Sequence, residues 1–278
     1  MIYLLLAIAS SAMVSILMRL STNRIRGNIS MLTMNYVMCL AISVGYTGVG
    51  ALFPLRSSLF QTLGMGVVHG VLYLLSFVLL QLNVKRNGVV LSATFMKLGL
   101  LVPMVVSLVL FGEQPGILQI VGFAIALAAI VLINFERGES VMQFRAGLLL
   151  LLLGGGFGDA MSKIFEELGD PAMSDQFLLY TFLTALVLCT VLMLHKGQRP
   201  GASEVFFGLL IGIPNFFSAR FLLRALDGLP GFIVYPTFSV GTILMVTLAG
   251  VVFFRERLSR RQFLAMGCIL AALVLLNL

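Results

Sequence analysis

The sequence predicts an all-α membrane protein with ten transmembrane helices, arranged as two inverted five-helix repeats. The first observation is composition, since 60% of the 278 residues are hydrophobic and only 10% are charged. Soluble domains carry about 25% charged residues. The second is a series of ten apolar runs, and the third is a match between the two halves of the chain. Hydrocarbon is therefore the expected solvent for most of the chain.

Crossing the hydrocarbon core takes about 20 mostly apolar helical residues. Loop chemistry such as Asn87-Gly88 and Asp227-Gly228 separates the apolar runs. The first run begins at Met1 with no basic region before it, so we expect a membrane helix there and not a signal peptide. The predicted helices are 1–19, 29–50, 60–82, 88–111, 115–134, 144–163, 174–194, 204–225, 230–253 and 261–278.

The two halves match at a constant spacing of 143 positions. Gly88 aligns with Gly231, and the pair Glu113 and Gln119 aligns with Glu256 and Gln262. The match is strong over the last three helices of each half and weak over the first two. It predicts two repeats, 1–134 and 144–278. Because five is an odd number, the second repeat enters the membrane from the opposite side, as in many secondary transporters.

Basic residues predict the orientation. Loops after the odd-numbered helices contain twelve, and the opposite side contains three, namely Arg56, Lys163 and Arg224. The excess marks the cytoplasmic side, so both termini are expected outside, in a bacterial inner membrane. The net charge of +7 is then an orientation and lipid-headgroup signal and not a nucleic-acid signal. The twelve are Arg24, Arg26, Lys85, Arg86, Arg137, Arg145, Lys196, Arg199, Arg255, Arg257, Arg260 and Arg261.

The sequence lacks the patterns of enzymes and metal proteins. Cys39, Cys189 and Cys268 lie in apolar runs without a C-x-x-C or Cys/His pattern, and we expect them to be packing residues. The two histidines, His69 and His195, belong to no H-E-x-x-H or G-x-S-x-G cluster. We therefore predict no catalytic centre, no metal and no cofactor, while proton coupling stays open.

A short motif recurs after the fourth helix of each half. It reads Leu110-Phe111-Gly112-Glu113 in the first half and Phe253-Phe254-Arg255-Glu256 in the second, each followed by a glutamine. With the five-helix repeats, this pattern resembles the EamA-type carriers of the drug/metabolite transporter superfamily. The resemblance implies an alternating-access carrier of small metabolites, usually an exporter. It also implies a proline that opens the fourth helix, a role available to Pro103, whereas the Trp-Gly pair frequent in the family's first helix is absent.

Two charged residues lie near the middle of predicted helices. Lys97 lies in the fourth helix, and its repeat counterpart is Val240, so this charge is not part of the shared scaffold. A charge at the bilayer centre costs at least about 2.5–3.5 kcal/mol, which favours a functional role. Lys97 is expected either to contact an anionic group or to form a structural ion pair with Asp159.

Asp159 follows the run 154–158, which contains four glycines. The glycines permit close helix packing or local unwinding. The carboxylate could couple protons, contact a cation or pair with Lys97.

The other candidate binding residues are polar or aromatic: His69, Tyr73, Asn215, Arg220 and Tyr235. His69 could bind substrate or carry a proton, or be a neutral core histidine, and Tyr73 lies one turn on along the same face. Arg220 follows Pro214-Asn215, where a kink is expected, and could bind an anion or reach the headgroups. Tyr235 precedes Pro236, which frees a backbone carbonyl, so it could line a cavity or mark a kink.

The motif glutamates are expected to have a structural role. Because carboxylates favour helix N-termini, Glu113 and Glu256 should cap the helices that follow them, 115–134 and 261–278. Glu256 could instead pair with Arg255 and Arg257.

These expectations favour a secondary transporter of a small polar metabolite. An anionic or zwitterionic substrate is favoured because Lys97, Arg220 and His69 outweigh Asp159. The expected site lies at the membrane midplane between the repeats. The expected partners are the substrate and membrane lipids, with no nucleic acid, and the chain would act as a monomer or homodimer. The alternatives are a membrane enzyme, a lipid-linked phosphate flippase or an interaction subunit.

Overall fold

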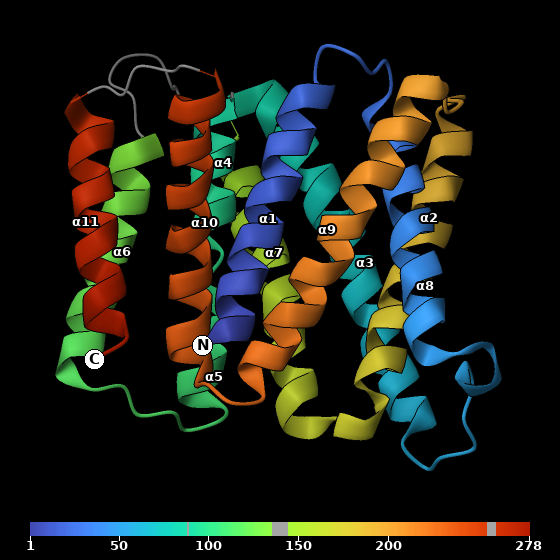
Figure 1. Cartoon of the computed structure of the whole chain (residues 1–278), viewed down its shortest axis with the longest axis horizontal. Helices are drawn as coiled ribbons and strands as arrows, with labels where there is room; N and C mark the ends of the chain where they lie inside the picture. Colours follow the sequence, from blue (N-terminus) through green and yellow to red (C-terminus); the bar gives the residue numbers. More distant parts are fainter. Residues whose placement is uncertain (88, 135–143, 255–259) are drawn as a thin grey trace. The chain divides into compact units, whose positions relative to one another are not determined.

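The structure is a computed structural model that describes residues 1–87, 89–134, 144–254 and 260–278. Within these ranges every regular element is a helix, which confirms the predicted all-α class (Figure 1). The α-helices are α1 (Ile2–Ser21), α2 (Asn28–Thr47), α3 (Leu59–Asn87), α4 (Val89–Leu98), α5 (Leu101–Val109), α6 (Ile117–Asn134), α7 (Arg145–Leu168), α8 (Ser174–His195), α9 (Ala202–Leu226), α10 (Gly231–Phe254) and α11 (Arg260–Leu276).

Eight helical segments of the described chain are long and apolar enough to cross a membrane. One of the eight, Ser92–Val109, combines parts of α4 and α5. The predicted helices 115–134 and 261–278 correspond to shorter apolar helices, Ile117–Leu132 and Gln262–Leu276. These lengths are compatible with an integral membrane protein.

The predicted continuous helix 88–111 is wrong in one respect, because α4 ends at Leu98 and α5 begins at Leu101, with Gly99-Leu100 between them. Pro103 has no N–H, and its ring clashes with the carbonyl four residues earlier, which is that of Gly99. The Gly99 carbonyl instead accepts from Val102 N–H at 2.9 Å, in a tighter turn. The interruption that Pro103 was expected to cause is therefore present, and it leaves Lys97 in the last turn of α4.

The chain forms two compact units. Unit 1 comprises Met1–Leu74 and Ile164–Asp227, and unit 2 comprises Leu75–Lys163 and Gly228–Leu278. Each unit takes helices from both sequence halves, so the units cut across the predicted repeats 1–134 and 144–278. Two of the three boundaries between them fall inside α3 and α7, and the third falls between α9 and α10.

Closely packed helix pairs build unit 1. Gly208 and Gly212 of α9 lie against α2, and Gly66 and Gly70 of α3 lie against α8. A Cβ on Gly70 would lie 2.6 Å from the carbonyl oxygen of Thr181. Glycines four positions apart on one helix face allow this close approach.

Three hydrogen bonds tie the first turns of α3 and α9 to distant segments of unit 1. The Glu204 carboxylate, in α9, accepts from the N–H groups of Arg26 at 2.6 Å and Gly27 at 3.3 Å. The Gln61 amide, in α3, donates to the carbonyl oxygen of Leu168 at 2.8 Å. All three bonds satisfy backbone groups at or next to a helix end, where such groups lack partners within the helix.

Acidification is expected to remove one loop contact of unit 1. Ser58 Oγ donates to Asp170 at 2.8 Å and the Ala172 N–H donates at 3.0 Å, and these bonds hold the pKa of Asp170 below its ordinary value. Since the folded pKa lies below the unfolded one, of about 3.9, the stabilisation is present above the unfolded value and lost as pH falls through the folded one. In Ser58→Ala, the pKa of Asp170 should rise in a carboxyl ¹³C NMR titration. Ser57→Ala is the matched control, and an equal pKa in both variants would contradict the prediction.

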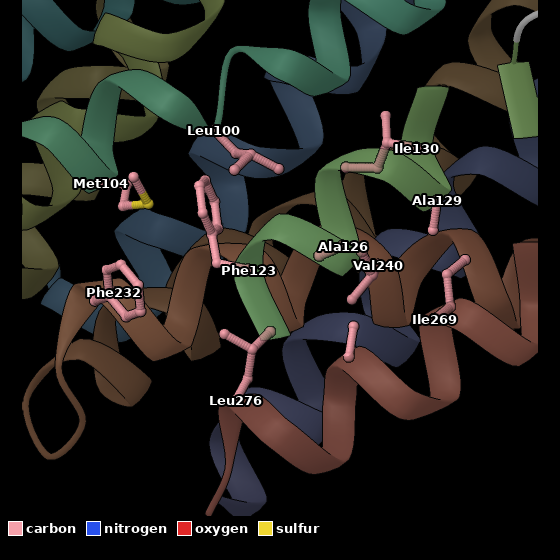
Figure 2. Packing of buried hydrophobic residues seen from close by; sticks show 11 residues of the cluster. Leu100, Met104, Phe123, Ala126, Ala129, Ile130, Phe232, Val240, Ile269 and Leu276 are labelled. Carbon is pink, nitrogen blue, oxygen red and sulfur yellow. The ribbon is translucent and has the colours of Figure 1, made fainter. Parts of the chain in front are cut away.

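An apolar cluster forms the core of unit 2. Figure 2 shows its side chains, with Phe123 of α6 and Phe232 of α10 close together, and their ring centroids lie 5.7 Å apart. Val240, the sequence counterpart of Lys97, is fully buried in this cluster. The position in α10 that matches Lys97 at a spacing of 143 is therefore a core position. α6 and α11 also pack closely, since a Cβ on Gly122 would lie 2.9 Å from Cβ of Leu275.

Candidate functional site

The break between α4 and α5 lies directly against the glycine run of α7, within unit 2. A Cβ on Gly156 would lie 2.4 Å from the carbonyl oxygen of Gly99, and a Cβ on Gly99 would lie 3.1 Å from the nitrogen of Gly156. Beyond the neighbouring backbone of its own helix, Gly155 has no atom of the described residues within 4 Å of its Cβ position. α7 stays helical through the run, so the glycines serve close packing and the alternative of local unwinding is wrong.

Lys97 and Asp159 flank this contact. Lys97 precedes Gly99 by two residues, and Asp159 follows Gly156 by three. The two charges interact electrostatically, yet no direct ion pair joins them in the described part of the chain. Lys97 is half-buried and Asp159 is exposed. Both charged groups therefore keep hydrogen-bonding capacity for a third polar group.

Tyr235 joins α10 to α7 at the level of Asp159. Its hydroxyl donates to the backbone carbonyl oxygen of Asp159 at 3.0 Å, and its side chain is buried. Pro236 lies inside α10 without ending the helix. Tyr235 thus positions the α7 backbone beside the candidate site.

Removing the Tyr235 hydroxyl should weaken this contact. In Tyr235→Phe we expect a loss of about 0.5–1.5 kcal/mol, the usual net value of a hydrogen bond. Thermal unfolding in detergent measures it. Tyr3→Phe, on an exposed side chain of α1, is the control and should be neutral. Equal stability of Tyr235→Phe and the parent protein would mean that the bond contributes nothing.

Glu113 forms a second charged cluster in unit 2. Its carboxylate accepts from the N–H groups of Gly231 at 2.8 Å and Phe232 at 2.9 Å. The ammonium of Lys163, which is buried, lies 3.1 Å from the same carboxylate and 5.9 Å from the centroid of the Phe111 ring. Glu113 therefore caps α10.

The expectation that Glu113 caps its own following helix is wrong. The N–H of Gly116, just before α6, donates to the Gln119 side chain at 3.1 Å instead. Gly112 has a φ of 66°, a left-handed conformation that glycine adopts without strain, and this turn directs Glu113 toward α10. The corresponding expectations for Glu256, Arg255 and Arg257 lie outside the described residues.

The Lys97–Asp159 pair and the Glu113 cluster are neighbours along α7 and α10. Lys163 follows Asp159 by four residues in α7, and Gly231 precedes Tyr235 by four in α10. Residues four apart share a helix face, one turn of about 5.4 Å along the axis. The Glu113 cluster thus lies one turn from Asp159.

His69 is enclosed by aromatic rings in unit 1. Its ring stacks on Tyr73 at 4.7 Å and on Phe177 at 5.2 Å, and Thr181 Oγ1 lies 3.4 Å from its Nδ1. The predicted shared face of His69 and Tyr73 is confirmed. The side chain is buried, an environment that accommodates a neutral, hydrogen-bonded histidine.

Arg220 and Asn215 of α9 contact neighbouring helices of unit 1. Arg220 forms an ion pair with Asp175 of α8, and its guanidinium lies 4.0 Å from the Tyr46 ring centroid. Asn215 donates to the side-chain oxygen of Asn35 at 3.2 Å. Both residues therefore connect α9 to its neighbours.

The structure divides the candidates between the units. Lys97, Asp159 and Tyr235 gather in unit 2, whereas His69, Tyr73, Asn215 and Arg220 lie in unit 1. Sequence reasoning missed the contribution of Lys163, although its spacing of four residues from Asp159 could have indicated it. Among the described residues, no group of three His, Cys, Asp or Glu side chains could hold a metal ion.

Comparison with known proteins finds a similar fold but does not name an activity. No family model matches the chain. An uncharacterized protein of Haemophilus influenzae is 26% identical over 203 residues, which cover 71% of this chain and 69% of that protein. A crystal structure with 15% sequence identity superposes with a TM-score of 0.76, covering 99% of this chain and 94% of the other. This chain therefore has a fold similar to that of a known crystal structure.

Proposed function

We propose that this protein is a secondary transporter that exports a small polar metabolite across a bacterial inner membrane by alternating access. The observation that carries the proposal is the pair Lys97 and Asp159, two charges that interact without a direct ion pair within the described ranges. They lie beside the interruption of a membrane-length apolar segment. Charges inside such segments are costly and usually mark substrate or ion pathways. Interrupted helices are typical of transporter binding sites. The resemblance to EamA-type carriers agrees with this.

Hydrogen bonds of unit 1 support the inverted repeat where sequence matching is weak. Gln61 and Glu204 are 143 positions apart, and each lies in the first turn of its helix. Gln61 bonds the carbonyl of Leu168, and Glu204 bonds the N–H groups of Arg26 and Gly27. At the same spacing Leu168 corresponds to Ile25, next to Arg26. Equivalent helix starts therefore reach equivalent segments, as expected for ten helices in two repeats.

The charges favour a zwitterionic or anionic substrate. The Lys97 ammonium would bind a carboxylate, and Asp159 would bind an ammonium group or carry a coupled proton. Both groups belong to unit 2. A simple cation would be repelled by Lys97, so it fits this pair less well.

Transport by purified protein in liposomes tests the proposal. A panel of labelled small carboxylates and zwitterions is applied with and without a proton gradient. We expect at least one compound to move in the parent protein and in Lys85→Met, which alters an exposed lysine, and not in Lys97→Met. Absence of movement of every compound under every gradient would overturn the proposal.

A further inference from the structure

The Glu113 carboxylate lies among donors that are all carried by helices. These are the N–H groups of Gly231 and Phe232 at the start of α10, and the Lys163 ammonium in α7. Ser107 of α5 adds a hydroxyl, because a Cβ on Gly231 would lie only 2.4 Å from its Oγ. We call these four residues the cradle.

The hydroxyl of Ser107 indicates that the cradle does more than cap α10. Its side chain is fully buried, and its hydroxyl has no hydrogen-bond partner among the described residues. Buried hydroxyls normally have a hydrogen-bond partner, because a buried polar group without a hydrogen bond costs free energy. The cradle therefore presents a donor that Glu113 does not use.

Glu113 itself is not held by a helix, unlike the four residues of the cradle. It lies in the non-helical turn between α5 and α6, and its side chain retains 14% exposure. Its own N–H donates to the carbonyl oxygen of Ser107 at 3.1 Å. The carboxylate can therefore rotate away while the backbone stays attached and the cradle keeps its shape.

We propose that the cradle is a binding site for the carboxylate group of a small solute, and that Glu113 occupies it as a tethered substitute. Two adjacent N–H groups and an ammonium match the two oxygens of a carboxylate, as Glu113 itself demonstrates. The site lies one helical turn from Asp159 along α7 and one turn from Tyr235 along α10. A carboxylate released by Lys97 would meet it next, and this last step alone rests on the proposed transport function.

Chemical rescue tests the cradle without any transport assay. Glu113→Ala empties the site, and its melting temperature is measured in detergent against sodium acetate, with sodium chloride at equal ionic strength as the baseline. We expect the variant to melt several degrees below the parent protein and acetate to restore the loss in a saturable manner. The parent protein should respond little. Adding Lys163→Met should abolish the recovery.

Glu113→Gln keeps an acceptor for the α10 N–H groups and decides the matter where Glu113→Ala does not fold. A neutral amide is displaced more easily than a carboxylate, so acetate should raise the melting temperature of Glu113→Gln above its chloride baseline. Acetate no better than chloride would overturn the proposal. Stabilisation by phosphate at lower concentration than acetate would overturn the assignment to carboxylates. Rescue without metabolite transport would leave the cradle intact and reject the transport function.

Discussion

Gly156→Ala is expected to destabilise the protein by about 1–3 kcal/mol, the usual cost of overpacking. The added Cβ would lie 2.4 Å from the Gly99 carbonyl oxygen and 2.5 Å from a methyl carbon of Val102. Because the first atom is backbone, no side-chain rotation relieves the clash, and α7 must move away from the α4–α5 break. Thermal or chemical unfolding in detergent measures the loss, and substrate transport should fall with it.

Gly155→Ala is the matched control in the same helix. Apart from its own helix backbone, no atom in the described part of the chain lies within 4 Å of its Cβ position, and alanine favours a helix over glycine by about 1 kcal/mol. It should therefore be neutral or slightly stabilising. If the two variants lose equal stability, the tight contact with Gly99 is not the reason for glycine at position 156.

Lys97→Met and Asp159→Asn should each weaken substrate binding by about 10- to 100-fold. A hydrogen bond to a charged group contributes about 1.5–3 kcal/mol, and about 1.4 kcal/mol corresponds to a factor of ten. Each single change also leaves the other charge without its electrostatic counterpart. Binding to the purified protein is measured by calorimetry with the substrate that the transport panel identifies.

The double variant separates binding from stability. Groups that interact should show a coupling of about 0.5–3 kcal/mol in unfolding, so Lys97→Met with Asp159→Asn should be more stable than the sum of the single losses. Lys85→Met controls for loss of an exposed positive charge. Full substrate affinity in Lys97→Met would show that Lys97 does not contact an anionic group.

Helix positions could be predicted from the sequence because they depend on local properties. The length of an apolar run sets whether a helix can cross hydrocarbon, and loop residues mark its ends. The opening at Pro103 was implied by the family resemblance, and it is also a local effect, since the steric effect of proline reaches only one helical turn. The start of the α5 helix at Leu101, just after Gly99-Leu100, follows from that effect.

Lys97, Asp159 and Tyr235 could be named in advance because polar groups in apolar segments are conspicuous. Their arrangement could not, since it depends on which helices pack together. Nothing local to Glu113 indicates that its carboxylate caps α10, more than one hundred positions away. Similarly, Arg220 gave no sign of its partners, because Asp175 and Tyr46 come from α8 and α2.

The sequence by itself determined the helical class, the apolar segments and the charged residues that cannot be ordinary core. Only the tertiary structure decided that Gly156 meets Gly99, that Lys97 and Asp159 interact without a direct bond, and that Glu113 occupies the cradle. The physical reason is the range of the forces. Hydropathy and backbone sterics act along the chain over a few residues, whereas close packing and charge pairing act through space between helices from different parts of the sequence.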